Sequence, residues 1–204
     1  MKPWAVVPAK SFARAKTRLE LPAPDRALLA RALLAHVLDT LGASSELAGI
    51  AVVTDSDEVA ALADARSAAV VRDRPDLDRS ARPGGLGAII DGALGEIAAL
   101  GARAAIVVMA DLPELSARDV AALAATLREC PVAVAPDRRD RGTNALGLAP
   151  IDVMPTCFGH DDSFRRHLDR ARGRELPCAV RRSRGLGFDI DLPDDYRELI
   201  APGR

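Results

Sequence analysis

Residues 104–113 read AAIVVMADLP, a short apolar run that ends at Asp111 and turns away at Pro113. Both alternating faces of the run are apolar, as in a strand that is buried on both sides of a parallel sheet. A carboxylate directly after such a strand lies at the carboxyl edge of the sheet, where open α/β sheets bind ligands and hard cations. The stretch therefore predicts a central strand and makes Asp111 a candidate ligand. The alternative is that Asp111 only caps the Ser116 turn or lies in solvent.

Similar apolar runs recur along the chain and alternate with segments of helical spacing. The other predicted strands are 4–7, 50–53, 68–71 and 132–135, and the predicted helices lie within 28–41, 59–63, 86–97 and 120–127. The last helix follows Ser116, a predicted N-cap with Asp119 at the third helical position. This alternation predicts an α/β fold with a mostly parallel (mixed) sheet flanked by helices. No linker or repeat interrupts it, so we expect residues 1–204 to form a single domain.

Composition excludes several functional classes. The chain has 28 Lys and Arg against 29 Asp and Glu, a net charge of −1, which argues against a nucleic-acid partner. No apolar stretch reaches 18 residues, so no membrane span is expected. The N-terminal apolar run is too short for a signal peptide. Cys130, Cys157 and Cys178 form no CxxC pair and are interpreted as reduced thiols, which is consistent with a cytoplasmic protein.

A basic loop follows the first predicted strand. Residues 6–19 read VVPAKSFARAKTRL, with Lys10, Arg14, Lys16 and Arg18 inside nine residues. Such a loop fits around a polyphosphate, because lysine supplies a point charge and arginine a bidentate fork. It lacks the GxxxxGK[ST] pattern of a phosphate-binding P-loop. On charge alone, a solvated basic turn remains the simpler interpretation.

An acidic pair lies near the end of the chain, in GLGFDIDLPDDY at residues 185–196. In an extended segment Asp189 and Asp191 point to the same side, whereas Phe188 and Ile190 pack the other way. Two carboxylates side by side repel each other unless a cation lies between them, so the spacing predicts a metal site. The acids that follow Pro193 are expected to begin the last helix.

Two further segments offer hydrogen-bond donors. Residues 141–148 read RGTNALGL, a predicted donor loop that contains Thr143 and Asn144, and Gly159 and Ser163 precede a helical run that includes His167. Free N–H groups at a helix start bind anions, although a simple N-cap at Ser163 is the plainer interpretation. His167 is interpreted as a packed, hydrogen-bonded side chain.

The polar stretches 72–85 and 136–144 each follow a predicted strand. They are interpreted either as loops that hold a ligand or as solvated surface loops.

Together, five of these stretches resemble one known family. They are VPAKSFARAKTRL (7–19), MADLP (109–113), RGTNAL (141–146), FGHDDSF (158–164) and GFDIDLPDDY (187–196). In this order and combination they are similar to the guanylyltransferase of deazaflavin coenzyme F-420 biosynthesis, called 2-phospho-L-lactate or phosphoenolpyruvate guanylyltransferase. The resemblance implies a nucleotidyltransferase fold of the glycosyltransferase-A-like type. It also implies transfer of GMP from GTP to phosphoenolpyruvate, 2-phospho-L-lactate or 3-phospho-D-glycerate, with release of pyrophosphate.

The same resemblance implies roles for individual residues. Two Mg²⁺ ions would be held by Asp111, Asp189 and Asp191, which with Lys16 form the catalytic set. The nucleotide-binding residues would be Lys10, Lys16 and Arg18 at the GTP phosphates and Gly84 and Gly85 against the guanosine. The acid would be held by Thr143, Gly159 and Ser163.

Two positions depart from the family pattern. Gly87 stands where members often carry Asn, and the gap between Gly159 and Ser163 is one residue longer than usual. The longer gap predicts that Ser163 is displaced and that Asp162 intrudes on the acid site.

The expected partners are GTP and a small phosphorylated acid, without nucleic acid or membrane. Hand-off of the unstable product to the downstream transferase and assembly as a homodimer both stay open. The alternatives are a related nucleotidyltransferase acting on a molybdopterin or a sugar phosphate, and a catalytically silent nucleotide-binding module. A molybdopterin or sugar-phosphate enzyme would begin with a Gly-rich loop that this chain lacks, and a silent module would have lost the metal carboxylates.

Overall fold

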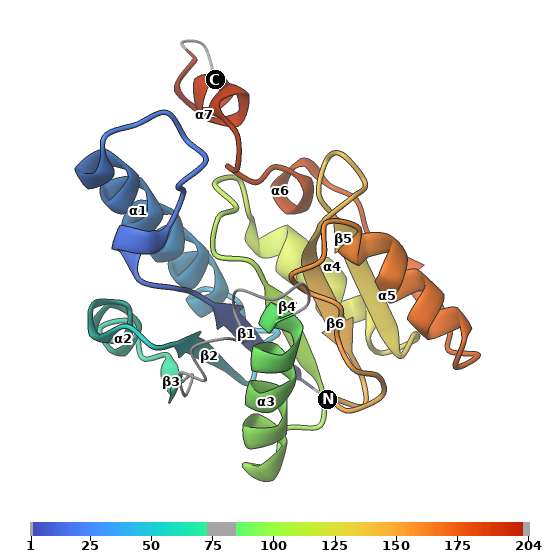
Figure 1. Ribbon diagram of the computed structural model, residues 1–204. Helices are drawn as coiled ribbons and strands as arrows, with labels where there is room; N and C mark the ends of the chain where they lie inside the picture. Colours follow the sequence, from blue (N-terminus) through green and yellow to red (C-terminus); the bar gives the residue numbers. More distant parts are fainter. Residues whose placement is uncertain (1, 73–84, 202–204) are drawn as a thin grey trace.

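A computed structural model describes residues 2–72 and 85–201, and its seven strands form one sheet (Figure 1). The strands are β1 (Trp4–Pro8), β2 (Gly49–Thr54), β3 (Ala69–Arg72), β4 (Ala105–Val108), β5 (Val132–Pro136), β6 (Thr143–Leu148) and β7 (Cys178–Val180). Their spatial order is β3-β2-β1-β4-β6-β5-β7. All neighbours pair in parallel except β6, which runs antiparallel to both β4 and β5.

Helices cover both faces of this sheet. They are α1 (Ala23–Gly42), α2 (Asp57–Asp64), α3 (Gly85–Ala99), α4 (Ala117–Thr126), α5 (Ser163–Arg172), the short α6 (Arg184–Gly187) and α7 (Pro193–Ile200). A 3₁₀ turn, η1 (Phe12–Arg14), lies in the basic loop. Helices α1, α2 and α4 pack on one face, and α3 and α5 pack on the other (Figure 1). Burial on both faces explains why the central strands are apolar throughout.

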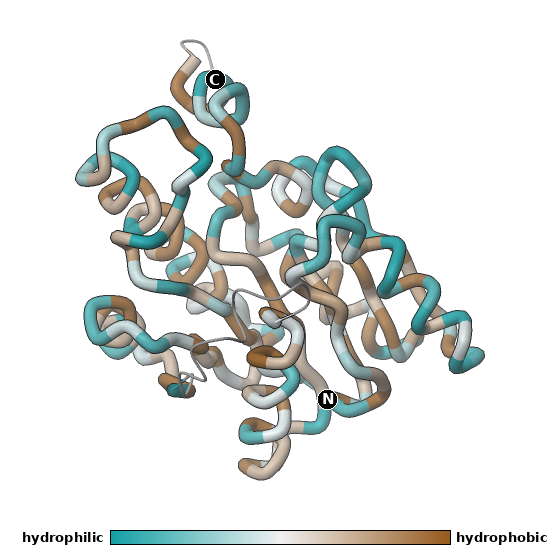
Figure 2. Tube along the Cα trace, viewed as in Figure 1, coloured by the Kyte–Doolittle hydropathy of each residue, from teal (hydrophilic) through white to brown (hydrophobic). Residues whose placement is uncertain are grey.

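The apolar side chains form one core on each side of the sheet and a third, smaller cluster. Figure 2 shows the brown, hydrophobic stretches of the tube running along the strands, with teal segments on the outer turns. The smaller cluster joins Leu19 of the basic loop and Leu33 of α1 to Phe188 and Ile190. It therefore fixes the segment with the acidic pair against the start of the chain.

The α/β class, the five predicted strands and the four predicted helices are confirmed, with ends shifted by a few residues. Ser116 caps α4 as predicted and forms a reciprocal capping box with Asp119. Strands β6 and β7 were missed, and the expected donor loop at 141–148 is mostly β6. Its sequence TNALGL is poor in β-branched residues, so its strand character comes from pairing with β4 and β5 on both sides.

The two polar stretches that follow predicted strands have different outcomes. The stretch at 136–144 is a loop only at 137–142, between β5 and β6. Most of the stretch at 72–85 lies outside the described residues. In the part of the chain that the structure describes, no helix is both long and apolar enough to cross a membrane.

Gly185 in α6 has no room for a side chain. A Cβ there would overlap Asp119 Oδ2 and come within 2.5 Å of the Glu114 carbonyl oxygen, which is backbone and cannot rotate away. We therefore expect Gly185→Ala to lower the free energy of unfolding by about 1–3 kcal/mol, measured by urea denaturation. Gly92→Ala in α3 is the matched control, because nothing lies within 4 Å of the added Cβ. It should stabilise the protein by up to about 1 kcal/mol through helix propensity. Equal effects of the two substitutions would contradict the packing described for α6.

Candidate functional site

A cleft of about 730 Å³ lies at the carboxyl ends of β1, β2 and β4. The loop after β1, the first turns of α3 and the turn before α5 complete its walls. Its charged and polar lining includes Lys10, Arg14, Lys16, Arg18, Asp55, Asp111, His160, Asp161 and Asp191. This is the edge at which open parallel sheets bind ligands.

Lys16 lies between two carboxylates from distant parts of the chain. Its Nζ donates to Asp111 Oδ2 at 2.6 Å and to Asp191 Oδ1 at 3.3 Å. The side chain of Lys16 is only 9% exposed, and its backbone adopts the left-handed conformation with φ of 55°. Burial disfavours the ammonium ion, but the charges of Asp111 and Asp191 outweigh it and raise the pKa of Lys16. Lys16 is therefore a fixed cation in the cleft.

Asp189 is the most buried of the three predicted metal ligands, with 5% exposure. Burial raises its pKa to about 7, and the negative charges of Asp111 and Asp191 add to the effect. Asp111 Oδ1 is also buried and has no hydrogen-bond partner. Among the described residues, no group of three His, Cys, Asp or Glu side chains is arranged to hold a metal ion, and the Lys16 ammonium is the cation in place. The oxygen of Asp111 that has no partner is a ligand of the kind that hard divalent cations prefer.

Strand β6 and the hairpin before it hold the segment that carries the acidic pair. Asn144 Nδ2 donates to the Leu186 carbonyl oxygen at 3.0 Å and to Asp189 Oδ1 at 3.3 Å. The Arg138 N–H donates to the Gly187 carbonyl oxygen at 2.8 Å. Asn144 was expected to face a ligand, but its amide instead orients a carboxylate. This role could have been predicted only if residues 143–148 had been recognised as a strand.

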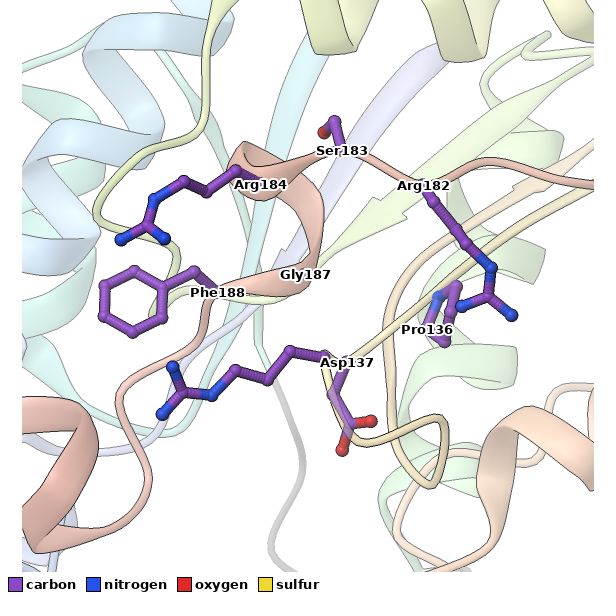
Figure 3. A pocket seen from close by; sticks show the side chains of 8 residues that line it. Pro136, Asp137, Arg182, Ser183, Arg184, Gly187 and Phe188 are labelled. Atoms are coloured by element: carbon purple, nitrogen blue, oxygen red, sulfur yellow. The ribbon is translucent and has the colours of Figure 1, made fainter.

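Side-chain contacts around Phe188 and α7 also hold the segment that carries Asp189 and Asp191. The Phe188 ring lies between the guanidinium groups of Arg138 and Arg184, at 5.0 and 5.1 Å from its centroid. Figure 3 shows Arg184 and Phe188 beside a second cavity of about 230 Å³. Asp195 is fully buried and accepts the backbone N–H groups of Asp191 at 3.0 Å and Leu192 at 2.8 Å. The predicted helix start after Pro193 is confirmed, and it anchors the backbone of Asp191.

The predicted phosphate-binding cations share the cleft with the carboxylates. Lys10, Lys16 and Arg18 all line it, and Arg14 forms an ion pair with Asp55 at 2.5 Å. Burial, followed by the neighbouring charge of Lys16, lowers the pKa of Lys10. The cations of the basic loop therefore lie among the acidic side chains of the cleft.

Of the two predicted guanosine contacts, only Gly85 lies within the described residues. Gly84 lies outside the described residues, and Gly85 is buried at the start of α3, whereas Leu86 and Ile89 border the cleft. Gly87 faces the backbone of the turn before α5, because a Cβ there would lie 3.2 Å from the Phe158 carbonyl oxygen.

Of the three predicted acid-binding residues, only Gly159 borders the cleft, with a left-handed φ of 83°. Thr143 and Ser163 are buried and do not line it. The expectation that Asp162 intrudes is wrong, because Asp162 is exposed and its carboxylate is held by Arg166 at 2.5 Å. His160 and Asp161 of the same turn line the cleft instead.

His167 is packed and hydrogen-bonded, as predicted. It is fully buried, with Nδ1 at 3.0 Å from Thr143 Oγ1 and Nε2 accepting the Cys157 N–H at 2.8 Å. Its ring meets the edge of Phe158 at 5.0 Å between centroids. Burial, with a smaller effect of Arg170, lowers the pKa of His167 to about 3. The imidazole is therefore neutral at physiological pH.

The sequence matches a protein-family model described as "Guanylyl transferase CofC like" over residues 3–204. The chain belongs to this family. A phosphoenolpyruvate guanylyltransferase of Sphaerobacter thermophilus is 40% identical over 202 residues, which cover 97% of this chain and 92% of that protein. A 3-phospho-D-glycerate guanylyltransferase of Phenylobacterium zucineum is 34% identical over 200 residues, which cover 96% and 88% of the two chains.

A solved structure with low sequence identity has a similar fold. Glucosyl-3-phosphoglycerate synthase of Mycobacterium tuberculosis, solved with Mn²⁺ and UDP, superposes with a TM-score of 0.59 at 14% identity. The match covers 88% of this chain and 68% of the synthase chain. At this identity the likeness shows the fold alone, and it agrees with the predicted glycosyltransferase-A-like class.

The buried His167 predicts a pH dependence of stability. In the unfolded chain the imidazole titrates near pH 6.5, whereas in the fold its pKa is about 3. Above pH 6.5 it is neutral in both states. As pH falls from 6.5 towards 3, only the unfolded chain binds the proton, so the free energy of unfolding falls by up to about 1.4 kcal/mol per pH unit.

Urea unfolding between pH 7.5 and pH 5 measures this slope. The same series on His167→Gln is the control, because glutamine does not titrate and the variant should lose this contribution. Identical slopes for the two proteins would contradict a depressed pKa at His167.

Proposed function

We propose that this protein transfers GMP from GTP to a small phosphorylated carboxylic acid and releases pyrophosphate. The observation that carries the proposal is that Asp111 and Asp191 line one cleft together with a loop of lysines and arginines, and that their charges act on the buried Asp189. The cations suit a triphosphate, and the acids suit the metal ions that accompany it. Membership of the guanylyltransferase family supports the choice of nucleotide.

The reaction does not require a strong general base. A phosphate monoester is already an anionic nucleophile, and its oxygen attacks the α-phosphorus of GTP in line. A new P–O bond forms as the bond to the β-phosphate oxygen breaks, and pyrophosphate leaves with those electrons. The main barrier is repulsion between two anions, which Lys10, Lys16 and Arg18 would reduce from their side of the cleft.

We infer that Asp111, Asp189 and Asp191 would hold Mg²⁺, most simply two ions. The unpartnered Asp111 Oδ1 and the crowding around Asp189 support this assignment, since both leave negative charge for a cation to balance. Bound Mg²⁺ would neutralise the triphosphate and polarise its α-phosphate. Lys16 would then exchange its carboxylate partners for phosphate oxygens. Glucosyl-3-phosphoglycerate synthase, which has a similar fold, was solved with Mn²⁺ and UDP, and this supports the choice of a divalent ion.

The acceptor class follows from the relatives, which act on phosphoenolpyruvate and 3-phospho-D-glycerate. We propose an acid of this type, including 2-phospho-L-lactate, and a role in coenzyme F-420 biosynthesis. Incubation with GTP, Mg²⁺ and each acid in turn, with mass detection of the guanylylated product, identifies the acceptor. No product with any of the three acids would contradict the proposed function.

Asp189→Asn should abolish turnover and leave the fold intact. Loss of one carboxylate of a metal site costs several kcal/mol of transition-state stabilisation, so pyrophosphate release should fall by about 10²-fold or more. The melting temperature should not fall, because the amide removes a repelled charge. The control is Asp194→Asn, whose side chain is 82% exposed on α7. Near-normal turnover of Asp189→Asn in excess Mg²⁺ would contradict the metal role.

Lys16→Ala tests the nucleotide side of the site. A charge-assisted contact to phosphate contributes about 1.5–3 kcal/mol, so KM for GTP should rise by about 10- to 100-fold. Steady-state kinetics with GTP and the acid varied separately give the two KM values. Lys2→Ala, at an exposed position away from the cleft, is the control. A change in KM for the acid alone would show that Lys16 does not face GTP.

A further inference from the structure

One buried imidazole joins the residues that the resemblance assigned to the acid. His167 contacts Thr143 of β6 through Nδ1. Ser163 lies on the same helix as His167, four residues earlier, and its Oγ is 3.2 Å from Thr143 Oγ1. The other ring nitrogen, Nε2, holds the Cys157 N–H in the turn that leads to Gly159. The ring therefore links strand β6 to the turn before α5 through hydrogen bonds at both of its nitrogens.

The Cys157 amide fixes the tautomer of this ring. A backbone N–H can only donate, so Nε2 must be the unprotonated nitrogen. In a neutral imidazole the proton then lies on Nδ1 and is donated to Thr143 Oγ1. The low pKa of His167 agrees with this, because a second proton on the ring would break the bond from Cys157.

This tautomer determines what the two hydroxyl groups can offer. Thr143 and Ser163 together carry two hydroxyl hydrogens, and one of them bridges the 3.2 Å contact between the oxygens. Whichever hydroxyl donates across that contact, the other keeps its hydrogen, and His167 already occupies one acceptor site on Thr143. With Ser163 as the donor, Thr143 Oγ1 accepts from both Ser163 and His167, so Thr143 can only donate its own hydrogen to a further group. Such a donor suits an anion, and the acid contributes a carboxylate and a phosphate.

We infer that His167 is a positioning residue that orients the Thr143 and Ser163 hydroxyls as donors to the anionic groups of the acid. This rests on the proposed function. His167 touches neither substrate, and it acts through the proton on Nδ1. Its Nε2 has a separate task, which is to hold the turn that places Gly159 at the cleft.

Two isosteric variants separate the tasks of the two ring nitrogens. His167→Asn keeps an amide donor near the position of Nδ1 and loses the partner of the Cys157 N–H. His167→Gln keeps an acceptor near the position of Nε2 and loses the donor to Thr143. We expect His167→Gln to raise KM for the acid by about tenfold and to leave KM for GTP within twofold. His167→Asn should raise KM for the acid less.

A double-mutant cycle with Thr143→Val tests whether His167 acts through that hydroxyl. Valine keeps the shape of threonine, so Thr143→Val should itself raise KM for the acid, and adding His167→Gln should change it little further. Additive effects of the two substitutions, or equal rises in KM for GTP and acid, would overturn the inference. So would a lower melting temperature with an unchanged KM for the acid.

The readouts also distinguish this inference from the proposed function. If the unsubstituted protein makes no guanylylated product from any acid, the function fails. If it turns over normally and the cycle is additive, only the role of His167 fails. Should His167→Gln not fold, Thr143→Val and Ser163→Ala carry the test. Either should raise KM for the acid and not for GTP, and unchanged values in both would overturn the inference.

Discussion

The cleft is organised by three carboxylates that the fold forces together and by the one ammonium that lies among them. Asp111 follows β4, whereas Asp189 and Asp191 lie near the end of the chain, and Lys16 donates to two of the three. Bringing like charges into a partly buried site is unfavourable, and it raises the pKa of Asp189 to about 7. Binding of a cation relieves repulsion of this kind, which is the physical basis for the proposed Mg²⁺.

Holding the carboxylates against this repulsion requires rigid support from several elements. Asn144 orients Asp189, and the buried Asp195 fixes the backbone beside Asp191. Phe188 is stacked between two guanidinium groups, and its neighbour Ile190 packs on α1 and the basic loop. Every one of these contacts is made outside the cleft. The acidic segment is therefore preorganised by packing and hydrogen bonds, of which only the Asn144 contact uses a side-chain oxygen of the acidic pair.

Strand β6 contacts both a proposed metal ligand and the residues proposed to bind the acid. It is the one described strand that runs antiparallel to its neighbours, so its first residues lie at the carboxyl edge of the parallel strands. Thr143 and Asn144 are consecutive and therefore face opposite sides of the sheet. One contacts His167 and Ser163 beside the turn at Gly159, and the other contacts Asp189. A single strand end thus supports both halves of the candidate site.

The sequence by itself determined the α/β alternation and the place of Asp111 after a buried strand. These depend on local periodicity and on the rule that parallel strands end at one edge. Only the tertiary structure decided that TNALGL is a strand, that Asn144 serves a carboxylate, and that Asp162 turns outward to Arg166. The same holds for the tautomer of His167, which is set by partners 10 and 24 residues away. Such features depend on which distant groups meet, and a polar side chain carries no local signal of the partner that burial will give it.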